Sequence, residues 1–440
     1  MQFDMTDLPD SWQKRCIRDV GAVVTGRTPS TKREDFYGGD YNLISPADLD
    51  NGKYVITAHK RLTNTGFMQC RALPKDTVLV GCIGNVGKLG MVADKQSATN
   101  QQINAVICNQ ENNPHFIYYS FHSNRSRLEQ AADKTTVPIL NKTNFENFEI
   151  AVPPLAEQHK IASVLGLVQR ALEQQERLIA LTTELKKTLL HKLFAEGLRG
   201  EPQKQTDIGS VPESWDVATL EDIAVAFDYG TSVKCEHGKA GAPVLRIPNV
   251  LGGSIDLSDL KHGQPKRSEL EQLRLQDGDL LFVRTNGVLE NAGRCALYRG
   301  ELEGCYFASY LIRVRVDSSK VLPAFVNEYA RTERGRSFLS GRAIRTADGK
   351  FNINSGTLKR VLLPLPGLDE QKEFVRQLDL VERKFTLHES KRSALSNLFR
   401  TLLHQLMTAQ IRVHAFDLSD AKTLDQQSTI RMRIGKHGST

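Results

Sequence analysis

The residues whose spacing comes nearest to known chemistry form a glycine-rich run at positions 81–89, GCIGNVGKL. A phosphate-binding loop has the spacing Gly-x-x-x-x-Gly-Lys-Ser/Thr, in which the lysine holds phosphate and the hydroxyl holds Mg²⁺. Here Gly81 and Gly87 are one residue too far apart, and Leu89 stands in place of the hydroxyl. We therefore interpret this run as a glycine-rich connection between strands.

A second motif, Asn113-Pro114-His115-Phe116, is similar to the Asn-Pro-Pro-Tyr loop of amino-methyltransferases. It lacks the second proline, so a helix N-cap followed by proline is the simpler interpretation. The sequence has no Gly-x-Ser-x-Gly elbow, no His-Glu-x-x-His motif and no Cys-x-x-Cys pair among its seven cysteines. We predict no metal site, and we favour a binding protein over a self-contained methyltransferase or nuclease with unrecognised motifs.

Basic and amide side chains instead gather in the loops of two blocks of the chain. Arg reads guanine and Asn or Gln reads adenine in the major groove of DNA, whereas Lys mostly holds phosphate. Any single cluster also fits an ordinary solvated loop, but comparable clusters recur in both blocks. The candidate DNA-binding residues are Arg27, Lys32, Asn85, Lys88 and Gln101 in the first block and Arg284, Asn286, Arg345 and Lys350 in the second.

The composition is compatible with a polyanionic partner, because the formal net charge is +7 and the isoelectric point is about 8.9. A hydrophobic content of 40% and a charged content of 25% are typical of globular proteins. We expect no signal peptide and no membrane span, since no apolar run approaches the roughly 20 residues that a bilayer requires. Scattered cysteines favour a cytoplasmic location.

Two long helices must position these loops. Apolar residues recur at spacings of three and four over residues 157–194, which predicts one amphipathic helix. The motif Leu189-Leu190-His191-Lys192-Leu193 recurs as Leu402-Leu403-His404-Gln405-Leu406, and an offset of 213 holds along the whole helix. Both copies become polar halfway, at Gln175 and His388. We predict that the two helices bury their apolar stripes against each other over a fixed length, with an interface that includes Leu165, Leu172, Leu185, Leu189, Leu378, Phe385, Leu398 and Leu402.

The blocks before the helices also repeat. The only two tryptophans lie in Leu8-Pro9-Asp10-Ser11-Trp12 and Val211-Pro212-Glu213-Ser214-Trp215, and each motif opens a block. Each block predicts short strands (77–80, 90–93 and 104–108; 280–284, 295–298 and 311–316) and one helix (115–130; 323–339). Val86-Gly87-Lys88 matches Ala292-Gly293-Arg294, and Leu73-Pro74-Lys75-Asp76 matches Leu275-Gln276-Asp277-Gly278.

The predicted fold class is α+β, with two pseudo-repeated globular domains of mixed strands separated by two long helices. The domains are residues 1–152 and 201–363, and a Gly- and Pro-rich linker at 196–212 spans the boundary at the start of the second domain. The helical spacers are 153–200 and 364–412, and 413–440 is a polar tail.

The run Pro153-Pro154-Leu155-Ala156-Glu157-Gln158, the helix-closing leucine motif and the second tryptophan motif together resemble the specificity subunits of type I restriction–modification systems. The resemblance covers residues 8–412. It implies two target-recognition domains, two helical spacers packed as an antiparallel coiled coil, and no catalytic activity of the chain's own. It also implies a bipartite DNA site. The partners would be double-stranded DNA, two modification subunits that use S-adenosylmethionine, and restriction subunits that use ATP and Mg²⁺. A coiled-coil scaffold that does not bind DNA is the further alternative.

Overall fold

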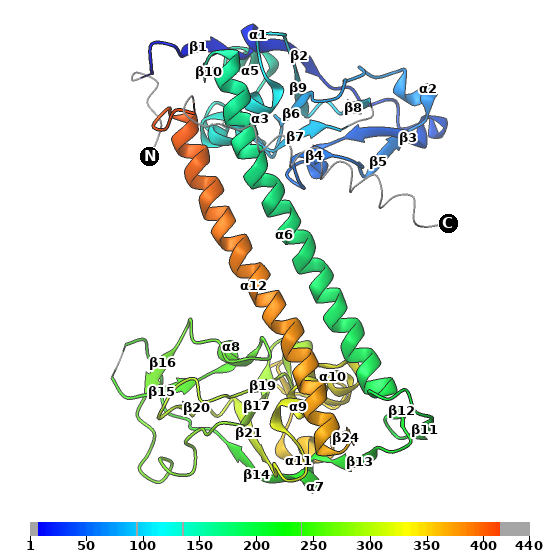
Figure 1. The fold of residues 1–440 in the computed structure, drawn as a ribbon, viewed down its shortest axis with the longest axis vertical. Coiled ribbons are helices and arrows are strands. Elements are labelled where there is room, and N and C mark those ends of the chain that lie inside the picture. Colours follow the sequence, from blue (N-terminus) through cyan, green and yellow to red (C-terminus); the bar gives the residue numbers. More distant parts are fainter. Residues whose placement is uncertain (1–7, 94–95, 134–135, 239, 414–440) are drawn as a thin grey trace. The chain divides into compact units, whose positions relative to one another are not determined.

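The computed structural model describes residues 8–93, 96–133, 136–238 and 240–413 (Figure 1). The chain divides into two compact units, a first unit of residues 1–178 and 388–440 and a second unit of residues 179–387. Each unit therefore combines one globular block with part of each long helix. The predicted polar tail, apart from Val413, lies outside the described residues.

The two long helices are α6 (Leu155–Glu196, 42 residues) and α12 (Leu368–Met407, 40 residues), and they pack against each other (Figure 1). Pro153 and Pro154 precede α6, and Glu157 lies in its first turn, where a carboxylate favours the helix dipole. Gly197 ends α6 with a left-handed φ of 68°.

The first unit contains a five-stranded sheet with the order β2-β9-β6-β7-β4, a three-stranded sheet with the order β5-β3-β8, and the antiparallel pair β1-β10. The strands are β1 (Gln13–Cys16), β2 (Gly21–Thr25), β3 (Tyr37–Ile44), β4 (Tyr54–Val55), β5 (Lys60–Leu62), β6 (Val78–Gly81), β7 (Leu89–Val92), β8 (Ser97–Thr99), β9 (Ile103–Cys108) and β10 (Glu149–Val152). The helices are α1 (Ile17–Val20), η1 (Glu34–Phe36), η2 (Pro46–Asp48), α2 (Asn64–Phe67), α3 (Pro114–Ser123), α4 (Arg125–Gln130) and α5 (Lys142–Glu146).

The second unit repeats this topology with a four-stranded sheet β14-β21-β17-β19, a three-stranded sheet β16-β15-β20 and the antiparallel pair β13-β24. It adds the sheet β18-β23-β22 and the hairpin β11-β12. The strands are β11 (Gln203–Thr206), β12 (Gly209–Pro212), β13 (Asp216–Thr219), β14 (Ala224–Tyr229), β15 (Ala242–Leu245), β16 (Lys261–Gly263), β17 (Leu280–Val283), β18 (Thr285–Asn286), β19 (Cys295–Leu297), β20 (Tyr306–Phe307), β21 (Leu311–Val316), β22 (Ile344–Arg345), β23 (Phe351–Asn352) and β24 (Leu362–Leu365). The helices are α7 (Leu220–Ile223), α8 (Ile247–Val250), η3 (Leu289–Asn291), α9 (Pro323–Arg331), α10 (Glu333–Ser340) and α11 (Ser355–Lys359).

The repeat seen in the sequence is confirmed at the level of single hydrogen bonds. Gly81 N donates to Lys88 O at 2.8 Å, and Val283 N donates to Arg294 O at the same distance. The matched positions Asp76 and Gly278 both adopt a positive φ, of 62° and 93°. The predicted α+β fold class and the paired long helices are therefore correct.

Two predicted helices and the predicted linker differ in the structure. Each single helix, 115–130 and 323–339, is two helices, because a new N-cap interrupts it at Asn124 and at Thr332. Glycine is required after the second break, since a Cβ on Gly335 would lie 2.4 Å from a backbone oxygen. Part of the linker, residues 203–212, forms the hairpin β11-β12.

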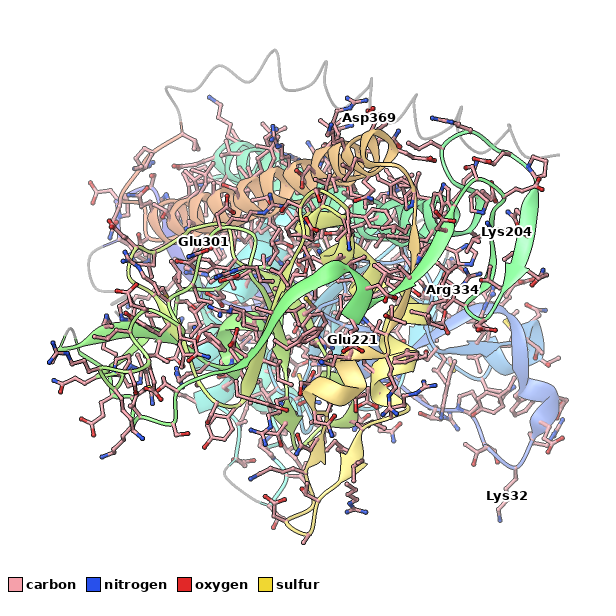
Figure 2. All side chains as sticks on the ribbon, turned by 90° about the horizontal axis from the view of Figure 1, so that it is seen from below. Lys32, Lys204, Glu221, Glu301, Arg334 and Asp369 are labelled. Atoms are coloured by element: carbon pink, nitrogen blue, oxygen red, sulfur yellow. The ribbon has the colours of Figure 1, made fainter. Side chains whose placement is uncertain are left out.

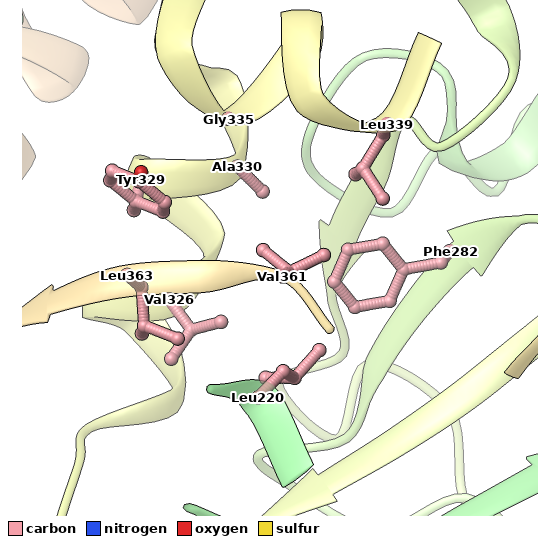
Figure 3. Close-up of a pocket in the computed structure, with 9 residues that line it drawn as sticks. All are labelled: Leu220, Phe282, Val326, Tyr329, Ala330, Gly335, Leu339, Val361 and Leu363. Atoms are coloured by element: carbon pink, nitrogen blue, oxygen red, sulfur yellow. The ribbon is translucent and has the colours of Figure 1, made fainter. Parts of the chain in front are cut away.

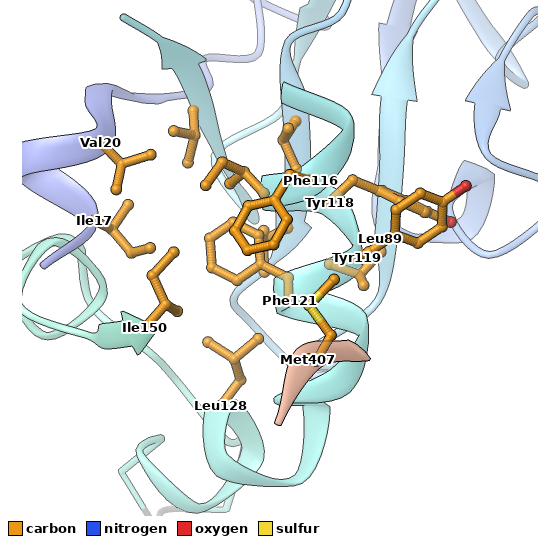
Figure 4. Close-up of a cluster of buried hydrophobic side chains, with 14 of the residues drawn as sticks. Ile17, Val20, Leu89, Phe116, Tyr118, Tyr119, Phe121, Leu128, Ile150 and Met407 are labelled. Atoms are coloured by element: carbon orange, nitrogen blue, oxygen red, sulfur yellow. The ribbon is translucent and has the colours of Figure 1, made fainter. Parts of the chain in front are cut away.

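Each unit buries one end of each long helix against its own core. In the first unit, Ile161, Leu165 and Met407 join the aromatic side chains of α3, including Phe116 and Tyr119 (Figure 4). In the second unit, Leu193, Phe194, Phe374 and Leu378 join the core around β17 and β21. Burying such side chains stabilises each by about 1.5–3 kcal/mol, so the helix ends are held by their domains.

A cavity in the core of the second unit is lined mainly by apolar side chains from α7, α9, α10 and β17 (Figure 3). Its volume is about 10 Å³, which matches a single water molecule. It has no room for a cofactor or substrate.

The predicted helix interface needs one correction. Leu165 and Leu378 are buried, whereas Leu172, Leu189, Phe385 and Leu402 are partly buried. Leu185 is 53% exposed, and its repeat equivalent Leu398 is 45% exposed. An apolar row with a spacing of 3.5 residues rotates slowly around a helix with 3.6 residues per turn. Next to Leu185, the side chain that is mostly buried between the helices is that of Lys186, which forms an ion pair with Glu382 of α12.

Candidate nucleic-acid interface

The predicted DNA-binding residues of the first unit belong to loops at one edge of its five-stranded sheet. Thr25, at the end of β2, pairs with Asn104, and Gly81, at the end of β6, pairs with Ile103. These pairings are antiparallel, so the ends of β2 and β6 meet the start of β9. The connections 26–36, 82–88 and 100–102 therefore emerge at the same edge.

Arg27 and Gln101 are brought together at this edge, and both are exposed. Arg27 N donates to Thr99 O at 2.8 Å, and Thr28 Oγ1 donates to Gln101 Oε1 at 2.8 Å. Only glycine fits between the two loops, because a Cβ on Gly26 would lie 2.1 Å from a backbone oxygen. The two exposed loop segments that carry Arg27 and Gln101 are thus held next to each other.

Lys32 lies farther along the same connection and extends away from the ribbon (Figure 2). Its neighbour Arg33 is engaged by Asp35, with Nε to Oδ1 at 2.8 Å and Nη2 to Oδ2 at 2.7 Å. This hydrogen bonding raises the pKa of Arg33 and lowers the pKa of Asp35. The exposed ammonium of Lys32 is therefore the better phosphate ligand of the two cations.

The predicted residues Asn85 and Lys88 have different surroundings. Asn85 is exposed, whereas Lys88 is partly buried and its Nζ donates to Pro46 O at 3.3 Å. In the second unit Arg294, at the equivalent position, donates from Nη1 to Leu251 O at 3.0 Å. Lys88 therefore ties its loop to the domain, and Asn85 is the side chain that this loop presents to solvent.

Arg284 occupies the corresponding edge of the second unit, directly after β17. Its backbone N donates to Tyr310 O at 2.8 Å, and its Nη1 donates to Ser309 O at 3.3 Å. The guanidinium carbon lies 4.8 Å from the ring centre of Tyr229, within cation–π range. Burial opposes ionisation of Tyr229, but hydrogen bonding with Ser355 and the charge of Arg284 lower its pKa overall. These contacts hold Arg284 in one orientation.

The other three predicted residues of the second unit are gathered by the small sheet β18-β23-β22. Asn286 and Arg345 both pair with Phe351, from opposite sides. Lys350 directly precedes Phe351 and forms an ion pair with Asp348 at 2.8 Å. Hydrogen bonds from Lys350 and Thr346 lower the pKa of Asp348 to about 2. All four predicted residues of this unit thus lie on or beside one three-stranded sheet.

Sequence reasoning missed the aromatic and aliphatic side chains at this edge. Tyr310 is 56% exposed, Ile344 is 65% exposed and Val288 is 51% exposed. Their signal in the sequence was their position at the ends of strands beside Arg284, Arg345 and Asn286. Apolar side chains among basic and amide groups suit the major groove, where the thymine methyl offers an apolar contact.

The described residues contain no group of three or more His, Cys, Asp or Glu side chains that could hold a metal ion. Within the same part of the chain, none of the helices combines the length and apolar character that crossing a lipid bilayer requires.

Comparison with known proteins gives consistent results. Residues 9–183 match the sequence model of the type I restriction modification DNA specificity domain. The chain is 23% identical to the type I restriction enzyme MjaVIII specificity subunit of Methanocaldococcus jannaschii, over 92% of this chain and 94% of the relative. It is 24% identical to the EcoKI specificity subunit of Escherichia coli strain K12, over 93% and 92%. The fold is similar to that of the S subunit of a type I system from M. genitalium, with a TM-score of 0.61, 18% identity and coverage of 92% and 98%.

Proposed function

Because this chain belongs to the family of type I restriction–modification specificity subunits, we propose that it reads DNA through the two sheet edges and performs no chemistry itself. The observation that carries the proposal is that one topology, repeated in both units, presents polar readers at the same edge of each. Base-edge readers must be exposed and held in fixed orientations. Arg27 is exposed and its backbone is anchored to Thr99, and the guanidinium of the partly exposed Arg284 is held by Ser309 O.

The two edges differ in their side chains, so we propose an asymmetric site with two unlike halves. Arg27 follows the glycine after β2, and Thr231 holds the equivalent position after β14. The equivalence is shown by matching backbone hydrogen bonds, from Arg27 N to Thr99 O and from Thr231 N to Phe307 O. Within the part of the chain that the structure describes, the sheet that carries Asn286 and Arg345 has no counterpart in the first unit. Different donors and acceptors select different bases.

The helices α6 and α12 are proposed to set the number of base pairs between the two halves. Their lengths of 42 and 40 residues are nearly equal, as expected of two copies of one spacer. Inserting residues near Gln175 is expected to change the gap or to abolish binding. A functional insertion variant with the original gap would contradict this part of the proposal.

The proposed partners are two modification subunits, which would bring S-adenosylmethionine, and restriction subunits, which would bring ATP and Mg²⁺. The chain itself would bind none of these cofactors. A cytoplasmic location follows from such partners and from a DNA substrate.

The test is reconstitution with a modification subunit of a related system, followed by mapping of methylated adenine on genomic DNA. We expect methylation at one bipartite motif only when both proteins are present. Exchanging residues 8–152 for those of a relative is expected to change one half of the motif and leave the other unchanged. Methylation by the purified chain alone would instead identify a self-contained enzyme, and binding that is indifferent to salt would favour a scaffold.

A further inference from the structure

We infer that the hydrogen bond between Gln175 and His388 selects the register of α6 against α12 at the centre of the helix pair, and with it the spacing that the proposed function requires. His388 Nδ1 and Gln175 Oε1 are 2.9 Å apart. The inference concerns the helix pair itself, and only its consequence for the DNA site rests on the proposed function.

The two residues occupy the same position of the internal repeat. They are separated by 213 residues, which is the offset that relates the two helices throughout. In an antiparallel pair of equivalent helices, equivalent positions face each other only at the centre. The contact therefore marks the alignment in which the two helices present matching positions to each other.

The helix ends are held by the cores of their domains, but the apolar positions at the centre of the pair give little reason for this alignment over others. Leu172 and Phe385 lie one turn from the contact on their own helices and are partly buried. Apolar contact is non-directional, so a slip by one turn replaces one aliphatic pairing by another. Coiled coils solve the same problem with single buried polar residues, which specify register at a cost in stability.

A slip by one turn leaves the imidazole of His388 without a partner and changes the partner of Gln175. Moving either helix by four residues places His388 opposite Ala171 or Ile179, neither of which has a side-chain hydrogen-bonding group. Gln175 then faces Lys384 or Arg392, whose cationic groups cannot donate to and accept from it as the imidazole can. The pair thus penalises both neighbouring registers.

The experiment measures register directly with spin labels attached to p-acetylphenylalanine at Ser163 and Ser390, two exposed helix positions. They lie at different levels of the helix pair, offset by about 15 Å along its axis, so an axial slip changes the distance between them. The ketone chemistry leaves the native cysteines untouched. The wild-type full-length chain should give one distance peak. In Q175L/H388L we expect a second peak holding about a tenth or more of the population, displaced on the scale of one helical turn, about 5.4 Å.

Three further variants make the result specific. Exchange of the residues, Q175H/H388Q, keeps the hydrogen bond if the positions are equivalent and should restore the single peak. The variant K186L/E382L removes an ion pair that joins non-equivalent positions and should leave the peak unchanged. A single undisplaced peak in Q175L/H388L overturns the inference, as does a second peak in the exchanged variant.

Methylation mapping with the modification subunit separates this inference from the proposed function. If Q175L/H388L has two registers, its complex should methylate sites with an altered gap as well as the original ones. Two registers with an unchanged motif would retain the register role and reject its link to DNA spacing. If the wild-type complex methylates nothing, the proposed function fails while the distance measurement still decides the register.

Discussion

The same position in the sheets of the two units is packed in opposite ways. In the first unit, Val24 pairs with Ala105 in the register of β2 and β9. In the second, Asp228 pairs with Arg313 in the equivalent register of β14 and β21. Arg313 is 3% exposed and Asp279, just before β17, is fully buried.

The second unit therefore builds an ionic network where the first uses apolar contact. Arg313 Nη2 lies 2.5 Å from Asp228 Oδ2, and its Nη1 lies 3.8 Å from Asp279 Oδ2. Arg315 donates hydrogen bonds from Nε and Nη2 to Oδ1 and Oδ2 of Asp279, at 2.7 and 2.9 Å. The equivalent residues of the first unit are Val24, Thr77, Ala105 and Ile107.

This difference shows that the repeated fold depends on its backbone pairing rather than on one core chemistry. The two kinds of packing are not equally tolerant of change, however. A void in an apolar sheet costs the lost contacts, whereas an unpaired buried charge costs its full desolvation. The second unit should therefore be the more sensitive to a single substitution.

The largest expected effect is that of Arg313→Met, which leaves Asp228 and Asp279 with fewer partners. Breaking a buried ion pair costs about 3–5 kcal/mol, so the second unit should unfold at lower urea concentration. Each unit has one tryptophan, Trp12 or Trp215. Fluorescence of a Trp12→Phe background therefore reports the second unit alone.

The matched control transplants the first unit's residues as D228V/D279T/R313A/R315I. Replacing a whole network by apolar residues is often nearly neutral, so this variant should be more stable than R313M. If the single and fourfold variants lose equal stability, the network is not the reason for the sensitivity.

Acid should lower the stability of the first unit more than that of the second. His115 is the second residue of α3, and the equivalent residue of α9 in the second unit is Ala324, which does not titrate. Burial, aided by the charge of Lys53, lowers the pKa of His115 to about 4. In the unfolded chain His115 has a pKa near 6.5, so between pH 6.5 and pH 4 the unfolded state binds more protons than the folded state. The contribution of His115 to the free energy of unfolding is therefore fully present above pH 6.5 and is lost as the pH falls toward 4.

Allowing for partial exposure, we expect His115 to account for about 2 kcal/mol of lost stability between pH 7 and pH 4.5. Urea unfolding followed by Trp12 in a Trp215→Phe background measures it. The variant His115→Gln should lose less stability over this range than the wild type. Equal pH dependence in the two proteins would contradict this assignment.

A smaller effect, specific to one half of the DNA site, is expected from Arg284→Ala. Loss of a base-reading arginine costs about 1–3 kcal/mol and relaxes one base position. Binding by the complex with the modification subunit, measured on DNA libraries randomised in either half, tests this. Arg284→Lys should not restore specificity, since lysine lacks the planar fork. A uniform loss across all sequences would assign Arg284 to phosphate contact instead.

The smallest effect is expected from Lys32→Ala in the first unit. One lost phosphate contact weakens binding uniformly and reduces the slope of log affinity against log salt by about 1. Titrations of the same complex at several salt concentrations measure the slope. A change of preferred base would show that Lys32 reads sequence.

The sequence by itself determined the repeat, the α+β class and the two long helices. These depend on local periodicity and on the offset of 213 residues that stays constant along the two long helices, both of which are visible without tertiary contacts. The equivalence of Lys88 and Arg294 could likewise be read from neighbouring glycines. Arg284, Asn286, Arg345 and Lys350, which were predicted from two short segments rich in basic and amide residues, lie on or beside one three-stranded sheet.

Only the tertiary structure decided which of these side chains are free to contact a ligand and which are used within the protein. Lys88 is held by Pro46, Leu185 faces solvent, and Tyr310 stands exposed beside Arg284. The buried ionic network of the second unit joins residues far apart in the chain. Burial and pairing depend on the three-dimensional neighbours of a residue, and those neighbours are brought together by long-range strand pairing that local sequence patterns do not encode.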